Sequence, residues 1–141
     1  MTWIFDGKEI LSHSDLPEEC TDFVYELTFT DGTRYIGKKT IRSIRKKKPT
    51  KAQLAKRKNF SRKEMTNLPF VDYVGSSTEN DGKTLSYKEI LYLSSNKKTA
   101  SYLEMIMLVM NDVLFNDTFN NKNISGTYFS SSLDGLISCK T

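Results

Sequence analysis

The alternation of apolar and polar residues predicts two β-hairpins in the first third of the chain. Each hairpin has two β-rich runs around an Asp-Gly pair: Trp3–Phe5 with Glu9–Leu11, and Phe23–Phe29 with Thr33–Gly37. Asp-Gly favours a tight turn because both residues tolerate the left-handed backbone conformations that connect two strands. We therefore expect two antiparallel strand pairs.

The length of the second turn decides which side chains share a face of the sheet. A two-residue Asp31-Gly32 turn would place Tyr25 and Tyr35 on opposite faces. A three-residue loop over Thr30–Gly32 would place both tyrosines on one face, with Tyr25 opposite Gly37. We predict the three-residue loop. The alternative is that both tyrosines are ordinary strand residues that pack the sheet.

Downstream of the hairpins the pattern changes. A short helix is predicted over residues 50–58, with Thr50 as its N-cap, and a loop over residues 66–83, which contain Pro, Gly and Ser clusters. Residues 84–93 fit either a strand or a helix. Residues 99–115 are predicted to form the longest helix because apolar residues recur at three and four positions, namely Leu103, Ile106, Met107, Met110, Val113 and Leu114.

These elements predict one domain of the α/β (α+β) class, in which a small antiparallel β-sheet is flanked by helices. A chain of 141 residues suits a single core. We expect an N-terminal hairpin extension (1–20), a central domain (21–129) with a basic insertion (38–63), and a short tail (130–141).

Charge is strongly segregated along the chain. Residues 38–63 hold 13 of the 21 Lys and Arg residues and none of the 17 Asp and Glu residues. A short run of this kind is usually a solvated surface, but thirteen like charges repel one another unless a polyanion neutralises them. We therefore expect salt-sensitive nucleic-acid binding. The predicted DNA-binding residues are Lys39, Arg42, Lys46, Lys47, Lys48, Lys51, Lys56, Arg57, Lys58, Arg62 and Lys63.

The residue types that are scarce exclude several classes of chemistry. The chain has one histidine, His13, and two cysteines, Cys20 and Cys139, which is too few for a structural zinc site or for histidine-based catalysis. Two distant cysteines fit reduced thiols, and no apolar run is long enough for a membrane helix. We therefore expect a cytoplasmic protein without membrane contact, whose chemistry uses Tyr, Lys, Arg and carboxylates.

Short motifs spread over residues 23–129 carry a resemblance to a known family. They are Val24-Tyr25, Tyr35-Ile36-Gly37 followed by Lys38-Lys39, Asp72–Ser77, Ser101–Glu104 and Asn123–Gly126. In this order they resemble the GIY-YIG nucleases, in particular small freestanding endonucleases of bacteriophages related to homing endonucleases. The first motif reads Phe-Val-Tyr instead of Gly-Ile-Tyr, and it keeps the tyrosine that carries the chemistry. If phage-encoded, the protein would act in the host cytoplasm.

The resemblance implies an endonuclease that depends on Mg²⁺ (or Mn²⁺) and hydrolyses phosphodiester bonds in double-stranded DNA. Tyr25 would be the general base, with a pKa lowered by Lys38, Lys39 and Arg45, and Tyr35 would orient the water or the phosphate. The remaining implied roles are a phosphate clamp for Arg45, a metal ligand for Glu104, and a positioning residue for Asn121.

Alternatives remain open at several of these positions. Arg42 competes with Arg45, and Asn120 and Asn123 compete with Asn121. Glu104 lies three residues after Ser101, a capping-box spacing, so it could instead close a helix N-terminus. The chain could also be a non-catalytic nucleic-acid-binding protein that acts through residues 38–63. The sequence does not decide whether a homodimer forms.

Overall fold

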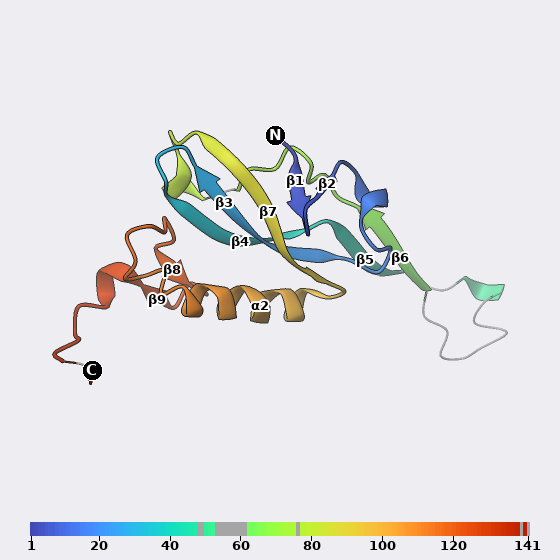
Figure 1. Ribbon diagram of the computed structural model, residues 1–141. Coiled ribbons are helices and arrows are strands. Elements are labelled where there is room, and N and C mark those ends of the chain that lie inside the picture. The colour runs from blue at the N-terminus through green and yellow to red at the C-terminus, as the bar shows by residue number, and fades with distance from the viewer. Residues whose placement is uncertain (48–49, 53–61, 76, 139, 141) are drawn as a thin grey trace.

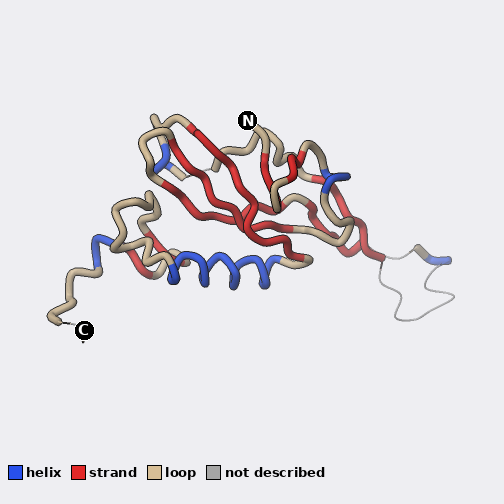
Figure 2. Tube along the Cα trace, in the orientation of Figure 1, coloured by secondary structure: helices blue, strands red, loops and turns tan. Residues whose placement is uncertain are grey.

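The computed structural model describes residues 1–47, 50–52, 62–75, 77–138 and 140. In these residues a five-stranded sheet has the order β2-β1-β7-β3-β4, and its strands are β1 (Trp3–Phe5), β2 (Lys8–Ile10), β3 (Asp22–Phe29), β4 (Arg34–Thr40) and β7 (Leu85–Ser94). Two separate ribbons pair β5 (Arg42–Lys47) with β6 (Arg62–Asn67) and β8 (Asn123–Ile124) with β9 (Tyr128–Phe129). One α-helix, α2 (Lys97–Met110), runs along one face of the sheet (Figures 1 and 2). Three short 3-10 turns are η1 (His13–Asp15), η2 (Thr78–Asn80) and η3 (Ser130–Ser132).

The first hairpin belongs to the main sheet. Its two-residue turn uses Asp6 and Gly7, with φ of 50° and 77°, and its register pairs Trp3 with Ile10. β1 also runs parallel to β7, so the sheet is mixed and not purely antiparallel. The predicted α+β class is confirmed, with the correction that the described residues place a single α-helix on one face instead of helices flanking the sheet.

The second hairpin has the predicted three-residue loop. β3 and β4 pair with Tyr25 opposite Gly37 and Leu27 opposite Tyr35, and the Phe29 N–H donates to the Thr33 carbonyl at 2.9 Å. Both tyrosines therefore leave the sheet on the same face.

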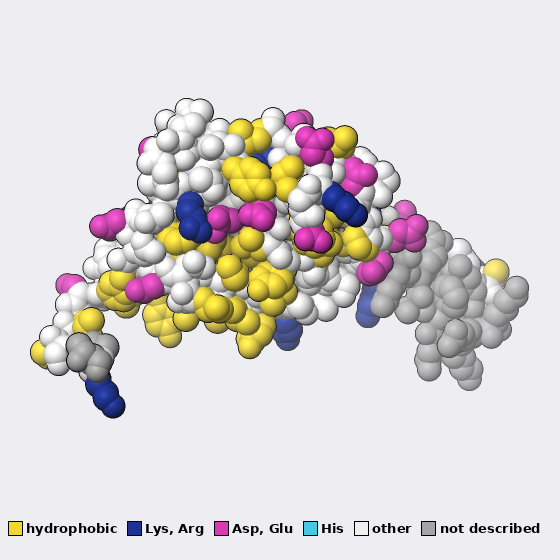
Figure 3. All heavy atoms as spheres, in the orientation of Figure 1, with side chains coloured by type: hydrophobic (Ala, Val, Ile, Leu, Met, Phe, Trp, Pro, Cys, Tyr) yellow, Lys and Arg dark blue, Asp and Glu magenta, His cyan; other side chains and the backbone are white. Residues whose placement is uncertain are grey.

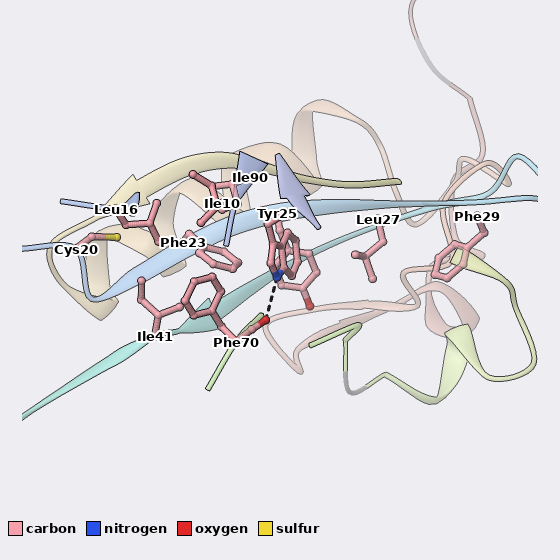
Figure 4. Close-up of a cluster of buried hydrophobic side chains, with 11 residues drawn as sticks. Ile10, Leu16, Cys20, Phe23, Tyr25, Leu27, Phe29, Ile41, Phe70 and Ile90 are labelled. Atoms are coloured by element: carbon pink, nitrogen blue, oxygen red, sulfur yellow. Dashed lines mark hydrogen bonds between the residues drawn. The ribbon is translucent and has the colours of Figure 1, made fainter. Parts of the chain in front are cut away.

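Alternation along β3 gives the sheet a core on each side. On the face away from α2, an aromatic cluster includes Trp3, Phe23, Tyr25 and Phe70, and the Trp3 indole N–H donates to the Phe70 carbonyl at 2.9 Å (Figure 4). On the other face, β3 and β4 pack against α2 and the segment after it through Val24, Ile36, Leu108, Val113 and Phe119. The buried faces fix the positions of β3, β4 and α2 relative to one another.

α2 begins and ends earlier than the apolar periodicity predicts. Asn96 is the N-cap, and its side chain accepts a hydrogen bond from the Thr99 N–H at 2.8 Å. At the other end the Asn111 side chain donates to the Met107 carbonyl at 2.8 Å, and Asp112 follows with a φ of 51°. Val113 lies in a turn after α2 but is still buried against the sheet. The apolar periodicity at this position therefore reflects burial and not helix formation. No helix among the described residues is long and apolar enough to cross a membrane.

The basic insertion departs most from the predictions. β5 and β6 form an antiparallel ribbon that projects from the body of the protein (Figure 1). The last two residues of β6 lie in the predicted 66–83 loop, which therefore begins later than predicted. Lys51 and Ala52 are helical, while most of the predicted helix over 50–58 lies outside the described residues. The same holds for four predicted DNA-binding residues, Lys48, Lys56, Arg57 and Lys58.

Arg42, one of the predicted DNA-binding residues, anchors this ribbon to the domain. Its side chain is 7% exposed, and its guanidinium donates to the backbone carbonyls of His13, Pro17, Glu18 and Cys20 at 2.6–3.3 Å. A guanidinium whose donors are used in this way is not available to clamp a phosphate.

Candidate active site

A pocket of about 400 Å³ lies at the edge of β4. It is built from β4, the turn at η2, α2 and the segment after Phe119. Four of the predicted catalytic residues meet in it, namely Tyr35, Lys38, Glu104 and Asn121, whereas Tyr25 and Arg45 are not part of its lining. The predicted site is therefore brought together only in part.

Glu104 lies half-buried on α2 and faces the pocket. Burial raises the pKa of its carboxyl, and the positive charge of Lys38 opposes that rise. The Lys38 ammonium donates a hydrogen bond to the Ser101 hydroxyl, one turn before Glu104. The alternative reading of Glu104 as part of a capping box is wrong, because α2 begins at Lys97 and Ser101 lies inside the helix.

Asn121 joins the pocket to the outer edge of β4. Its side-chain carbonyl accepts from the Ile36 N–H at 3.1 Å, and its amide donates to the Ile36 carbonyl at 2.8 Å. This pair of bonds satisfies both backbone groups of one edge residue, as a neighbouring strand would. Asn120 is bound elsewhere, to Thr33 and Asn80, and Asn123 reaches the pocket from a more exposed position.

Tyr25 lies behind this pocket, in the aromatic core. It is 2% exposed, and its ring packs edge-on against Trp3 and Tyr73, with ring centroids 5.3 and 5.9 Å apart. Its hydroxyl passes over Gly37, where a Cβ atom would lie 2.5 Å from the oxygen. The glycine of Tyr-Ile-Gly is thus required by the approach of this ring.

The pKa of Tyr25 is raised and not lowered, which corrects the prediction. Burial is the main cause, and a hydrogen bond with Tyr73 adds to it. The expected cationic neighbours lie elsewhere: Lys38 bonds Ser101, and the Lys39 ammonium lies 4.5 Å from the centre of the Tyr73 ring. A buried phenol with a raised pKa holds its proton at neutral pH.

Tyr35 is the phenol that lines the pocket, and it belongs to a short hydrogen-bond chain. Its hydroxyl is hydrogen-bonded to Ser77, and the Ser77 hydroxyl donates to the Glu79 carboxylate. Burial raises the pKa of Tyr35, and the charge of Glu104 adds to this effect. The same serine lowers the pKa of Glu79, which is partly exposed. The chain thus connects the pocket to a carboxylate near solvent.

Several of these residues carry no role in the sequence analysis. Tyr73 and Ser77 lie in the Asp72–Ser77 motif, and Glu79 follows it, but only the fold brings this segment to Tyr35. Lys88 holds the segment in place: its ammonium is buried within β7 and donates to the carbonyls of Val71 and Tyr73 at 2.8 and 3.1 Å. A charged residue in a strand gives no sequence signal of such burial.

Arg45 lies on the β5–β6 ribbon, opposite Glu64, and is exposed. The cationic side chains of the pocket are instead Lys38 and Lys122. Arg45 follows Gly37 by eight residues, but this spacing alone does not predict where the chain runs after β4. In the structure β5 carries Arg45 along the ribbon, outside the pocket.

A single metal ion fits the donor set of the pocket. Mg²⁺ commonly binds one or two carboxylates and keeps several waters, and Glu104 and Glu79 both face the pocket. No group of three or more His, Cys, Asp or Glu side chains that could hold a metal occurs in the part of the chain that the structure describes. An ion here would therefore be held by Glu104 together with water, in a volume large enough for both.

The fold agrees with the resemblance to the GIY-YIG nucleases, because paired strands carry both tyrosines and a packed helix carries Glu104. The chain belongs to this family: residues 3–132 match the family model described as "Putative endonuclease segE, GIY-YIG domain". The resemblance seen in the sequence motifs is thereby confirmed, and membership supports an endonuclease activity. No curated protein and no solved structure gives a significant match to the chain.

Proposed function

We propose that this protein is a Mg²⁺-dependent endonuclease that hydrolyses phosphodiester bonds in double-stranded DNA. The observation that carries the proposal is the pocket at the edge of β4, which brings an acid, a phenol and a lysine within one volume of about 400 Å³. Phosphodiester hydrolysis needs these three kinds of group to hold a metal, accept a proton and neutralise phosphate charge.

Glu104 is the proposed metal ligand. Its half-buried carboxyl has a raised pKa, so a nearby dication would favour the ionised form and offset the cost of burying the charge. A bound Mg²⁺ (or Mn²⁺) would supply Lewis-acid stabilisation of the phosphate oxygens. Asn121 positions the opposite wall by holding Ile36 of β4, so that the neighbouring Tyr35 faces the pocket.

Lys38 is the proposed phosphate contact within the pocket. Its ammonium lies beside Ser101 and close enough to Glu104 to lower that carboxyl's pKa. Arg45 is exposed on the ribbon outside the pocket, so we assign it to the flanking DNA backbone and not to the scissile phosphate.

Tyr35 is the proposed proton acceptor, in place of Tyr25. Its hydroxyl can take a proton from the attacking water while its own proton passes to Ser77 and the Ser77 proton passes to Glu79. Each oxygen gains and loses one proton, and the last proton leaves to solvent from the partly exposed Glu79. Tyr25 has a supporting role, because its ring packs beneath Gly37 and fixes the strand that carries Tyr35.

Cleavage of supercoiled plasmid tests the proposal. Wild type, Glu104→Gln, Tyr35→Phe and Tyr25→Phe are incubated with plasmid in Mg²⁺ and in EDTA, and binding is measured separately by gel shift. Tyr102→Phe, an exposed tyrosine on α2, is the control for loss of a phenol hydroxyl. We expect metal-dependent nicking that Glu104→Gln abolishes and Tyr35→Phe strongly reduces, whereas Tyr25→Phe retains most of it and all variants still bind.

Two results would contradict the proposal. Plasmid that is bound but stays intact in Mg²⁺ and Mn²⁺ would identify a non-catalytic nucleic-acid-binding protein. Nicking by Glu104→Gln at the wild-type rate would remove Glu104 from the reaction.

A further inference from the structure

The β5–β6 ribbon is a free-standing two-stranded arm. It forms its own sheet, with six residue pairs from Arg42–Asn67 to Lys47–Arg62, and it projects beyond the five-stranded sheet (Figure 1). The major groove of B-form DNA is about 12 Å wide and accepts a two-stranded β-ribbon. The arm therefore has the shape of an element that can enter a groove.

Positive charge dominates the segment that contains the arm. Residues 38–63 hold 13 Lys and Arg residues and no Asp or Glu residue, and Arg45 and Lys46 are exposed on β5. A polyanion along the arm would neutralise this charge, and the phosphate backbone of DNA is such a polyanion.

An apolar pair interrupts these charges in the middle of the arm. Ile44 and Met65 are directly opposite each other and are 50% and 45% exposed. Because side chains alternate along a strand, both leave the ribbon on the same face as Lys46. The pair thus forms an apolar contact surface beside Lys46, which suits a ligand that presents apolar and anionic groups side by side. In the major groove the thymine 5-methyl groups are apolar, and phosphates border them on both sides.

The arm is rigidly mounted on the domain. Arg42 donates to four backbone carbonyls of residues 13–20, and the Nε2 atom of His13 lies 3.0 and 2.8 Å from the carbonyls of Ile41 and Leu68, at the two ends of the ribbon's base. A fixed arm loses little conformational entropy on binding. The mount also sets the orientation of the arm relative to β4, which carries the pocket.

We infer that the β5–β6 arm docks in the major groove of duplex DNA, with Ile44 and Met65 against the base edges and Lys46 on the phosphates. The inference rests on the proposed function for its choice of DNA as the ligand. It adds that the arm senses thymine methyl groups, and not only backbone charge.

Binding in EDTA tests the inference without cleavage. Fluorescence anisotropy compares one short duplex in three forms: with thymine, with uracil in its place, and with bulky substituents on the pyrimidine 5-positions, which fill the major groove. The proteins are wild type, Ile44→Ser/Met65→Ser and Lys46→Gln. Val109→Ser/Met110→Ser is the matched control, because it removes exposed apolar side chains from α2 instead. Figure 3 shows hydrophobic side chains gathered over this helix.

The arm variants should separate methyl contact from charge. Wild type should bind the thymine duplex more tightly than the uracil duplex, by about fourfold for each methyl group that is buried, and should bind the bulky duplex poorly. Ile44→Ser/Met65→Ser should lose the preference for thymine while keeping its salt dependence. Lys46→Gln should weaken binding to both duplexes equally and reduce the salt slope by about 0.9.

Three results would overturn the inference. One is equal wild-type affinity for all three duplexes, and another is an unchanged thymine preference in Ile44→Ser/Met65→Ser. The third is a dimer that this variant converts to a monomer in sedimentation, with DNA binding unaltered, which would make the pair a self-association surface. Failure of the nuclease proposal gives a different pattern, because an inactive protein can still show the thymine preference in EDTA.

Discussion

The hydroxyl oxygen of Tyr25 occupies the space that a side chain on Gly37 would need, since a Cβ atom there would lie 2.5 Å away. Gly37→Ala should therefore displace a buried ring and destabilise the fold by about 1–3 kcal/mol, the usual range for overpacking a core. Urea denaturation measures this effect. Gly135→Ala is the control, because a Cβ at that position meets no atom within 4 Å. Equal stability of the two variants would show that β4 shifts freely and that Tyr25 does not fix it.

Burial of Glu104 predicts a dependence of stability on pH. The pKa of this carboxyl is raised in the folded state, so the folded protein binds the proton more tightly than the unfolded chain does. Stability from this group is present below the unfolded pKa of about 4.3 and is lost as the pH rises through the raised pKa. The stability of Glu104→Gln relative to wild type should therefore increase as the pH is raised from about 4 to about 8.

Urea denaturation at both pH values tests this prediction, with Glu9→Gln on the exposed strand β2 as the control. Mg²⁺ should stabilise wild type at the higher pH and leave Glu104→Gln unaffected, since a ligand stabilises only the state that binds it. A constant difference between wild type and Glu104→Gln at every pH would contradict the burial effect.

The chain from Tyr35 through Ser77 to Glu79 predicts coupled losses of activity. Ser77→Ala and Glu79→Gln should each slow nicking by roughly 100-fold at neutral pH, and the double variant should be little slower than either one, because each change breaks the same route. Single-turnover nicking at saturating protein measures this. The lost rate should recover as pH rises, since hydroxide then replaces the internal acceptor. Multiplicative effects with an unchanged pH profile would instead indicate two independent structural roles.

Arg42 and Lys46 should respond in opposite ways, although both are basic residues of β5. Arg42→Gln leaves buried carbonyls without a donor and should destabilise the fold by about 2–4 kcal/mol. DNA affinity of the folded Arg42→Gln fraction should keep its salt slope. Lys46→Gln should leave the unfolding curve unchanged and flatten the salt slope. Binding at several salt concentrations and urea denaturation of both variants test this prediction. A reduced salt slope in Arg42→Gln would indicate that Arg42 contacts DNA.

Asn121 should matter for both stability and activity. Asn121→Asp keeps an acceptor for the Ile36 N–H but faces the Ile36 carbonyl without a donor, at a position only 6% exposed. We expect a loss of about 1–3 kcal/mol together with loss of nicking. Asn123→Asp, at a more exposed position of the same pocket, is the matched control. Normal stability of Asn121→Asp would indicate that another group holds the edge of β4.

Local features of the sequence predicted local structure well. The Asp31-Gly32 pair predicted the β3–β4 hairpin and allowed two registers, of which the predicted three-residue loop is the one observed. The family motifs also pointed to Tyr35, Lys38, Glu104 and Asn121, which the fold brings to one pocket. These residues lie on elements whose pairing or periodicity is visible along the chain.

Features that depend on distant contacts were not predictable in this way. The parallel pairing of β1 with β7 joins residues more than eighty positions apart, and no local pattern encodes it. The basic insertion conceals a ribbon, because charged side chains on both faces hide the alternation of β5. The hairpin register placed Lys38 next to the residue opposite Tyr25, but the pKa of Tyr25 is set by burial against Trp3 and Tyr73, which the sequence does not reveal.

β4 is the outermost strand of the five-stranded sheet, and residues 118–121 cover it through bonds to Arg34 and Ile36. Uncovered, such a border would recruit strands from other copies of the protein into a growing aggregate. The segment that supplies Asn121 to the pocket therefore also protects the protein from aggregation. Substitutions that displace this segment would reduce the soluble yield as well as the activity, so the two properties would be lost together.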